Sequence, residues 1–348
     1  MNRAHGGDLA AFKREYGVEP LDFSANVSPL GVPEGVQAAL RRAAAEIDRY
    51  PDPECRALCR AIAEREGVPA ERVLCGGGAA DLIWRAVYAA KPKRALVTAP
   101  CFGEYEAALE AVGCEIVRSP LPYPFDVTDE LLCLIDRNLD FMFLCNPNNP
   151  TGRIVKTGLL RRIVERCAET GTRLLLDECF IDYLDEPEAH TMKRALGAYP
   201  GLLIVRAFTK LWAMAGARLG FALCADAGFL DAMRRAGPPW AVSTLAQAAG
   251  LAALRDVDYV NQVRRLIRSE RPRLAEALRG LGLRVVPGEA NFLLFQSRTE
   301  LDAPLRARGI LIRSCGGFAG LDKGWYRAAV RTGEDNDRLI AALGEIIK

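Results

Sequence analysis

The chain between residues 73 and 224 alternates short apolar runs with longer stretches in which apolar residues recur every three or four positions. The short runs are apolar at successive positions, which is typical of strands buried on both faces of a parallel sheet, whereas the longer stretches are typical of helices. The predicted strands are Val73–Leu74, Ala95–Thr98, Glu115–Arg118, Phe141–Cys145, Arg173–Leu176, Leu202–Val205 and Leu219–Leu223. The pattern therefore predicts an α/β fold, with a mostly parallel seven-stranded sheet and helices on both of its faces.

The two ends of the chain depart from this alternation. Residues 1–45 contain a stretch, Asp22–Gly31, with the Pro, Gly, Asn and Ser content of a loop. A long helical region is predicted from Val242 to about Gly280, followed by short strands and a last helix. Those strands are predicted at Leu283–Val286, Asn291–Phe295, Ile310–Arg313 and Tyr326–Val330, and the helix at Asn336–Ile347. We therefore expect an N-terminal arm at 1–45, a large domain at 46–255, and a small α+β domain at 256–348 that packs with the arm.

Residues capable of chemistry follow several of the predicted strands. Gly76-Gly77-Gly78-Ala79-Ala80-Asp81 leads from a strand into a helix, and the backbone N–H groups of such a helix start can bind phosphate. Asn149, Asp177 and Lys210 also come just after strands, and ligands of open parallel sheets bind beyond these carboxyl ends. A lysine held in apolar surroundings has a lowered pKa, which frees its amine to attack a carbonyl carbon. These positions predict one site at one edge of the sheet.

Each of these residues also has an ordinary structural interpretation. Lys210 could be a solvated loop lysine, Asp177 a helix cap or ion-pair partner, and Asn149 a turn residue. The glycine-rich stretch could be a plain turn between a strand and a helix. It is not a complete dinucleotide-binding motif, because Asp81 stands where the third glycine of GxGxxG belongs, and the chain contains no GxxxxGK[ST] motif.

Taken together, these motifs resemble the aspartate aminotransferase superfamily of fold type I over nearly the whole chain. Arg206-Ala207-Phe208-Thr209-Lys210 and the later Arg218 belong to the resemblance. It implies that pyridoxal 5'-phosphate is bound through Lys210, with Asp177 facing the pyridinium nitrogen and Asn149 donating to the ring's phenolic oxygen. It further implies that Phe102 stacks on the ring, and that Gly78, Ala79, Ala80, Thr209 and Arg218 surround the cofactor phosphate.

Three details refine the resemblance. Ala207 stands where the family often has a hydroxyl for the phosphate, and Phe180 stands where many relatives have a tyrosine near the ring. We therefore expect both of these contacts to be missing. Tyr50, in Arg-Tyr-Pro-Asp-Pro, matches a tyrosine that reaches the phosphate of the other subunit's cofactor, which implies a homodimer with shared sites. An interface aromatic without a chemical role would fit the same residue.

Two related groups within the superfamily fit the ends of the chain, the histidinol-phosphate aminotransferases and the threonine-phosphate decarboxylases of cobalamin biosynthesis. His5-Gly6-Gly7, Phe180, Thr209 and the segment from Arg327 to Thr332 resemble the decarboxylases. The resemblance implies decarboxylation of L-threonine O-phosphate or L-serine O-phosphate to an amino-alcohol phosphate. Transamination is the alternative, and a non-catalytic binding module of this fold is disfavoured because Lys210, Asp177, Asn149 and Arg218 are all present.

The same resemblance assigns substrate contacts. It implies that Arg327 binds the α-carboxylate, and that Arg313, His5 and Asn26 lie near the substrate phosphate. Guanidinium groups suit both anions, because they donate two parallel hydrogen bonds. Surface charge is the ordinary interpretation of the two arginines, and a polar residue in an arm or loop is that of His5 and Asn26. The sequence leaves the role of Arg331 and the choice between the two phospho-amino acids open.

Composition limits the remaining possibilities. The formal net charge of +2 provides no basic surplus for nucleic acid or an anionic membrane, and no apolar run approaches the roughly 20 residues of a membrane span. The 11 cysteines include no CxxC pair and the two histidines lie far apart, so metal-ligand spacing is not found. Residues 1–7 lack the apolar core of a signal peptide. We expect a cytoplasmic protein with reduced thiols.

Overall fold

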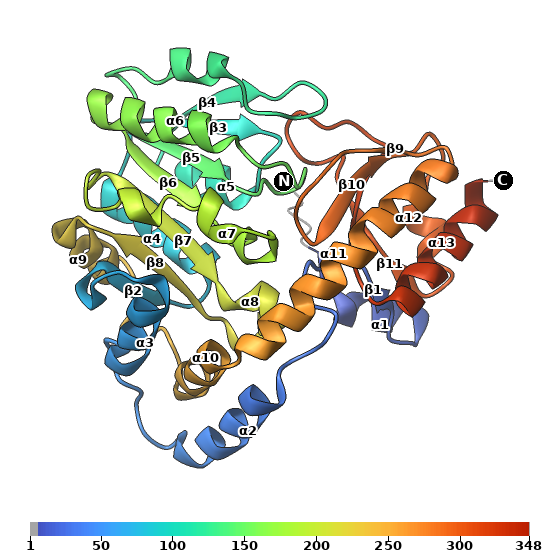
Figure 1. Cartoon of the computed structure of the whole chain (residues 1–348), viewed down its shortest axis with the longest axis horizontal. Coiled ribbons are helices and arrows are strands. Elements are labelled where there is room, and N and C mark those ends of the chain that lie inside the picture. Colours follow the sequence, from blue (N-terminus) through green and yellow to red (C-terminus); the bar gives the residue numbers. More distant parts are fainter. Residues whose placement is uncertain (1–5, 348) are drawn as a thin grey trace.

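The computed structural model describes residues 6–347, and a large layered unit stands beside a smaller one in Figure 1. The seven-stranded sheet of the large unit has the order β2-β8-β7-β6-β5-β3-β4. The bounds are β2 (Val73–Gly76), β3 (Arg94–Ala99), β4 (Glu115–Pro120), β5 (Phe141–Cys145), β6 (Arg173–Asp177), β7 (Leu202–Ala207) and β8 (Gly220–Cys224). All neighbours from β7 to β4 are parallel, whereas β8 runs antiparallel to both β7 and β2. The predicted mostly parallel sheet is confirmed.

Helices cover both faces of this sheet, which explains why its strands are apolar at successive positions. Leu174 and Leu176 of β6 face one hydrophobic core, and Leu175 between them faces another. The core around Leu175 also contains residues of α4 (Ala79–Ala90), α5 (Glu104–Ala111) and α9 (Ala227–Arg235). The core around Leu174 contains residues of α3 (Arg56–Glu66), α6 (Thr157–Thr170) and α10 (Thr244–Arg255). Burial on both sides leaves the strand ends as the place for polar residues.

The helical region after Val242 was predicted as one segment, and the structure corrects this to two helices. α10 ends at Arg255, and α11 (Val257–Gly280) begins after Asp256. The Asp256 side chain accepts a hydrogen bond from the backbone N–H of Tyr259, so this residue caps the second helix. α11 is the long helix that runs from the large unit to the smaller one in Figure 1.

The smaller unit contains a four-stranded antiparallel sheet of order β12-β13-β10-β9. Its elements are β9 (Arg284–Val285), β10 (Phe292–Gln296), β12 (Arg313–Ser314), β13 (Trp325–Ala329), α12 (Asp302–Arg306) and α13 (Gly333–Ile347). The predicted strand Ile310–Arg313 is divided in the structure. Its first part, β11 (Ile310–Leu311), pairs in parallel with β1 (Leu21–Asp22) of the arm, whereas its last residue begins β12.

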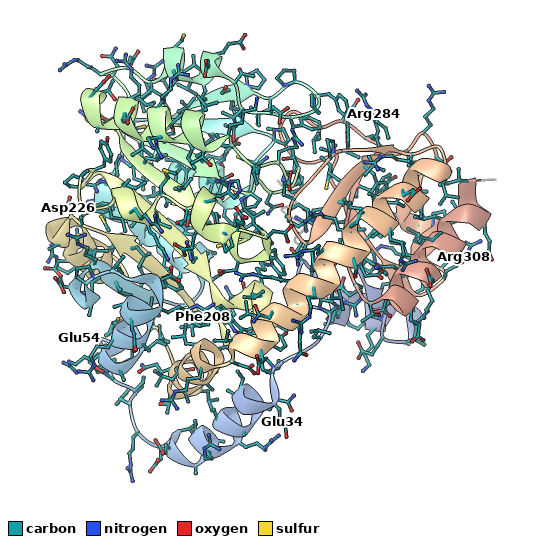
Figure 2. The ribbon with its side chains drawn as sticks, in the orientation of Figure 1. Glu34, Glu54, Phe208, Asp226, Arg284 and Arg308 are labelled. Atoms are coloured by element: carbon teal, nitrogen blue, oxygen red, sulfur yellow. The ribbon has the colours of Figure 1, made fainter. Side chains whose placement is uncertain are left out.

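The arm also contains α1 (Leu9–Tyr16) and α2 (Glu34–Ala43), and two one-turn helices, α7 (Pro187–His190) and α8 (Phe208–Leu211), lie in the large unit. Figure 2 shows the charged side chains of Glu34, Glu54 and Arg308 at the periphery, whereas Phe208 lies inside and is fully buried.

Within residues 6–347 no helix has the length and apolarity needed to cross a membrane. The domain limits at 45/46 and 255/256 stay predictions, because one hydrophobic core contains residues of both units.

Candidate active site at the strand ends

Lys210 lies in the short helix α8, directly after β7. Its Nζ atom lies 5.9 Å from the centroid of the Phe180 ring, and no carboxylate among the described residues forms an ion pair with it. Burial lowers the pKa of the Lys210 amine, and the positive charge of Arg327 lowers it further. Because a neutral amine is the nucleophilic form, these surroundings favour attack on a carbonyl carbon.

Asp177 ends β6, between the ends of β5 and β7, and it is buried. Its Oδ2 atom accepts a hydrogen bond of 2.6 Å from the Tyr105 hydroxyl, and its Oδ1 atom accepts one of 2.9 Å from the backbone N–H of Cys179. An ionised carboxylate has about four acceptor positions, so two further hydrogen bonds remain available to a ligand. The predicted strand-end carboxylate is therefore fixed in place and able to accept a donor.

Asn149 and Arg327 meet although they lie far apart in the sequence. Arg327, on β13, donates from Nη1 to Asn149 Oδ1 over 2.5 Å and from Nη2 to the carbonyl oxygen of Ser24 over 2.9 Å. The Nε atom of Arg327 is buried and has no hydrogen-bond acceptor among residues 6–347. Burial lowers the pKa of Arg327 to about 10, which still leaves the guanidinium charged at neutral pH. The large unit, the small unit and the arm thus converge on one arginine.

Arg313 stands directly opposite Arg327 in the β12–β13 register. Residues opposite each other in an antiparallel pair place their side chains on the same face. The Arg313 guanidinium lies 5.6 Å from the centroid of the Phe318 ring, and burial lowers its pKa. In the described part of the chain, neither arginine has a carboxylate within ion-pair distance. Two cations therefore face the same region without an anionic partner from the protein.

The other predicted substrate residues are placed differently. Asn26 is buried, and its side-chain oxygen has no donor among the described residues. His5 lies outside the described residues. Arg331 is engaged within the protein, because its Nε donates to Asp335 over 2.9 Å and its Nη1 to the Asp22 carbonyl over 3.1 Å. These bonds give Arg331 a structural role in holding the arm against the smaller unit.

The glycine-rich turn forms a narrow cradle at the start of α4. Gly78 has a φ of +99°, and a Cβ atom added there would lie 2.8 Å from Nη2 of Arg218. A Cβ atom at Gly220 would lie 2.8 Å from the carbonyl carbon of Gly78, so both positions require glycine. No side chain caps α4 at Gly78. The Gly77 N–H donates to Asp81, but the first N–H groups of a helix have no partner within the helix, and beside a guanidinium they form an anion site. The geometry therefore fits the phosphate of a bound cofactor.

The remaining residues predicted to contact the cofactor are Thr209, Phe102 and Tyr50, and only Tyr50 is exposed. Thr209 precedes Lys210 and is buried. Phe102 precedes α5 and makes an edge contact with Tyr105, at 5.6 Å between ring centroids. Tyr50 is 80% exposed and stacks on Trp240, at 4.6 Å between ring centroids. Tyr50 therefore faces outward in the single chain, where another chain can reach it.

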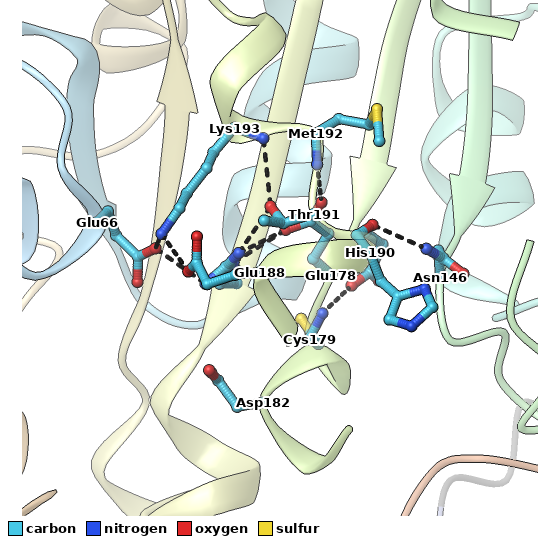
Figure 3. Close-up of polar contacts among 12 residues, drawn as sticks. Glu66, Asn146, Glu178, Cys179, Asp182, Glu188, His190, Thr191, Met192 and Lys193 are labelled. Atoms are coloured by element: carbon cyan, nitrogen blue, oxygen red, sulfur yellow. Dashed lines mark hydrogen bonds and ion pairs between the residues drawn. The ribbon is translucent and has the colours of Figure 1, made fainter. Parts of the chain in front are cut away.

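Sequence reasoning missed a buried ion network that joins the ends of β6 and β7, most of which is drawn in Figure 3. Arg206 donates from Nη2 to Glu178 Oε2 over 2.7 Å and from Nη1 to Glu66 Oε2 over 3.0 Å. Lys193 also reaches Glu66, over 3.1 Å, and the backbone N–H of Met192 donates to Glu178. The available signal was position, because Glu178 directly follows Asp177 and Arg206 lies four residues before Lys210.

The chain is similar to known proteins over nearly its whole length. Residues 18–343 match the family model for aminotransferase class I and II. The chain is 39% identical to threonine-phosphate decarboxylase of Salmonella typhimurium, over 100% of this chain and 97% of that protein. It is 35% identical to histidinol-phosphate aminotransferase of Symbiobacterium thermophilum, over 98% and 95% of the two chains.

A solved structure adds the cofactor. Histidinol-phosphate aminotransferase from Sinorhizobium meliloti in complex with pyridoxal-5'-phosphate matches with a TM-score of 0.90 and 27% identity, over 99% of this chain and 95% of that one. The lysine, the carboxylate and the glycine cradle described above fit that cofactor. The chain therefore belongs to the class I and II aminotransferase family and is an enzyme that depends on pyridoxal phosphate.

Proposed function

We propose that the protein decarboxylates L-threonine O-phosphate, or L-serine O-phosphate, to an amino-alcohol phosphate used in cobamide biosynthesis. The observation that carries this proposal is the pair Arg313 and Arg327, which share one face of the small sheet without carboxylate partners among the described residues. Burying like charges without counterions is unfavourable, so the arrangement fits a ligand with two anionic groups. A phospho-amino acid supplies a carboxylate and a phosphate that are separated by only a few bonds.

The assignment of roles follows the geometry. When bound, pyridoxal phosphate supplies an electron sink for the bond that breaks at the substrate Cα atom. Lys210 would hold the cofactor, and Asp177 would keep a proton on the pyridine nitrogen. The remaining cofactor contacts would come from Asn149, Phe102, Gly78, Ala79, Ala80, Thr209 and Arg218, with Tyr50 from a second subunit. Arg327 would bind the substrate carboxylate, and Arg313, Asn26 and His5 its phosphate.

The lowered pKa of the Lys210 amine supports a role for this group in proton transfer. A lowered pKa makes the ammonium form of Lys210 a stronger acid than that of an ordinary lysine. In a decarboxylase this group can deliver a proton to the Cα atom after carbon dioxide has left. Arg327, fixed by Asn149 and Ser24, would set the orientation of the carboxylate relative to the cofactor ring.

Transamination of histidinol phosphate is the second candidate. Because Arg313 and Arg327 are cross-strand neighbours, a single phosphate could contact both guanidinium groups, and such a substrate needs no carboxylate. The 35% identical relative from Symbiobacterium thermophilum is a histidinol-phosphate aminotransferase. The greater identity to threonine-phosphate decarboxylase supports the first candidate.

The experiment that tests the proposal measures products. Purified protein with pyridoxal phosphate is incubated with phospho-threonine, with phospho-serine, and with histidinol phosphate plus 2-oxoglutarate. We expect carbon dioxide and an amino-alcohol phosphate from the first two mixtures, and little keto product. Ready formation of the keto product, with no carbon dioxide from either phospho-amino acid, would reverse the choice between the two candidates.

A variant sharpens this test. Arg313→Ala should raise KM for the phosphorylated substrate about tenfold or more, because a charge-assisted contact of about 1.5–3 kcal/mol is lost. The affinity for pyridoxal phosphate should not change. Arg284→Ala is the matched control, because Arg284 is an exposed arginine on β9 of the same sheet and stacks on Tyr123. An equal KM in both variants would remove Arg313 from the substrate site.

We also propose that the enzyme is a cytoplasmic homodimer. Tyr50 and Trp240 form an exposed aromatic pair, and Ile47, near Tyr50 in the sequence, is 67% exposed. A surface of this kind is suited to a protein interface. The 11 cysteines are free, which is consistent with the reducing compartment expected from the sequence.

A further inference from the structure

We propose that Tyr105 is a positioning residue, whose hydroxyl fixes the Asp177 carboxylate in the orientation that receives the pyridine nitrogen of the cofactor. This inference rests on the role proposed above for Asp177. The observation is the 2.6 Å hydrogen bond from the Tyr105 hydroxyl to Asp177 Oδ2. Tyr105 is 1% exposed and Asp177 is 5% exposed, so water does not compete for this bond.

Packing alone does not account for a tyrosine at this position. The Tyr105 ring stacks on Phe143 of β5, with 4.8 Å between centroids and an interplanar angle of 11°, and it meets the edge of Phe102. A phenylalanine would make the same ring contacts. Burial of an unpaired hydroxyl is unfavourable, so the Tyr105 hydroxyl would destabilise the fold if it had no hydrogen-bond partner. Asp177 is that partner.

The hydrogen bond holds the carboxylate at a second point. The Cys179 N–H, two residues along the same segment, holds Oδ1, whereas Tyr105 reaches Oδ2 from α5 on the covering layer. Two donors on two different oxygens restrict rotation of the carboxylate about its Cβ–Cγ bond. Without the hydroxyl, only the backbone bond to Oδ1 would remain of the two.

The tyrosine remains a donor under all ordinary conditions. Burial raises the pKa of the Tyr105 hydroxyl, and the negative charge of Asp177 raises it further. The backbone N–H of Tyr105 also donates to the Phe102 carbonyl over 3.2 Å. One turn of chain therefore carries both the aromatic residue proposed to stack on the cofactor ring and the residue that orients the acid.

The test compares the affinity of the full-length protein for pyridoxal phosphate in matched variants. Tyr105→Phe keeps the ring and removes the hydroxyl, and we expect its Kd for the cofactor to rise about tenfold. Tyr183→Phe is the control, because the Tyr183 hydroxyl is equally buried but has no partner among residues 6–347. Its Kd should equal that of the unchanged protein. Turnover by Tyr105→Phe at saturating cofactor should fall in kcat more than it changes KM.

The double variant shows whether Tyr105 acts through Asp177. We expect Asp177→Asn to weaken cofactor binding, and the addition of Tyr105→Phe to change Kd no further. Independent, multiplying losses in the double variant would overturn the inference, as would an unchanged Kd in Tyr105→Phe when Asp177→Asn is impaired. An unimpaired Asp177→Asn would instead refute the role proposed for Asp177.

Discussion

At the scale of single residues, the charge around Lys210 comes from groups that lie far away in the sequence. Burial is the main cause that lowers the pKa of its amine, and the charges of Arg327 and Arg218 lower it further, whereas the residues next to it in α8 are apolar or uncharged. Phe180 contributes an apolar surface, with its ring at 5.9 Å from the amine. Phe180 also packs edge-on against Phe292, so its ring is held in a buried aromatic contact. The reactivity of the lysine is therefore set by the folded chain.

This leads to a prediction about pH and stability in the cofactor-free protein. The pKa of Lys210 is lowered in the folded state from 10.5, so in the window between the lowered value and 10.5 the unfolded chain binds more protons. The contribution of Lys210 to stability therefore rises with pH through that window, and below it the buried ammonium group destabilises the fold. Lys210→Met should raise the thermal midpoint near neutral pH, and the gain should shrink as pH approaches 10.5.

The measurement is the thermal midpoint of both proteins as a function of pH. One pKa unit corresponds to about 1.4 kcal/mol, so even a one-unit difference is measurable. Lys156→Met is the matched control, because Lys156 is an exposed lysine just before α6, and its effect should not vary in this way. A stability difference for Lys210→Met that stays flat from pH 7 to 10.5 would contradict the assigned surroundings of the amine.

At the scale of elements, the sequence was sufficient where one physical requirement dominates. Strands buried on both faces must be apolar throughout, so β5, β6 and β7 could be placed, and with them Asp177 and Lys210 at the strand ends. Divisions that depend on tertiary contacts were not predictable. The run Ile310–Arg313 looks like one strand, but it divides because β1 of the arm pairs with its start and β13 with its end.

The site shows the same division between what was predictable and what was not. Lys210, Asp177 and the glycine turn lie in motifs, and each could be named from the sequence. The bond from Tyr105 to Asp177 spans 72 positions, and that from Arg206 to Glu66 spans 140. No local pattern indicates such pairs, because the partners are chosen by the packing of separate elements. The network around Glu178 was therefore missed, although Asp177 at the end of β6 and Lys210 just after β7 were both identified.

That network predicts a large difference between buried and exposed ion pairs. Glu178→Gln removes the charge that Arg206 needs in a fully buried position, and loss of one partner of a buried pair typically costs about 3–5 kcal/mol. Asp185→Asn breaks the exposed pair with Arg268 at 2.8 Å, and should cost less than about 1 kcal/mol. Chemical denaturation of the two variants checks this expectation. Equal losses would mean that the network at the ends of β6 and β7 adds no stability beyond that of a surface pair.

At the scale of the whole molecule, the candidate site lies where three parts of the chain meet. The arm contributes the Ser24 carbonyl to Arg327, and the Ser28 N–H, which donates to the Lys210 carbonyl over 2.9 Å. The smaller unit contributes Arg327, and the large unit contributes Asn149 and Lys210. A movement of the smaller unit or of the arm would therefore change the position of Arg327 relative to Lys210. The residues proposed to bind the cofactor and those proposed to bind the substrate thus lie on different parts of the fold.

The last prediction is that the functional molecule is a homodimer with a shared site. Tyr50 is 80% exposed and Trp240 is 42% exposed, yet they stack on each other, so an aromatic surface is already ordered in the single chain. Covering such a surface is favourable, and contact with a second chain would bring Tyr50 to that chain's cofactor phosphate. Light scattering should give twice the mass of one chain. Tyr50→Ala should weaken cofactor binding, whereas Tyr123→Ala, at a tyrosine that is 43% exposed in the loop after β4, should not. A fully active monomer at the assay concentration would refute both the shared site and the role of Tyr50.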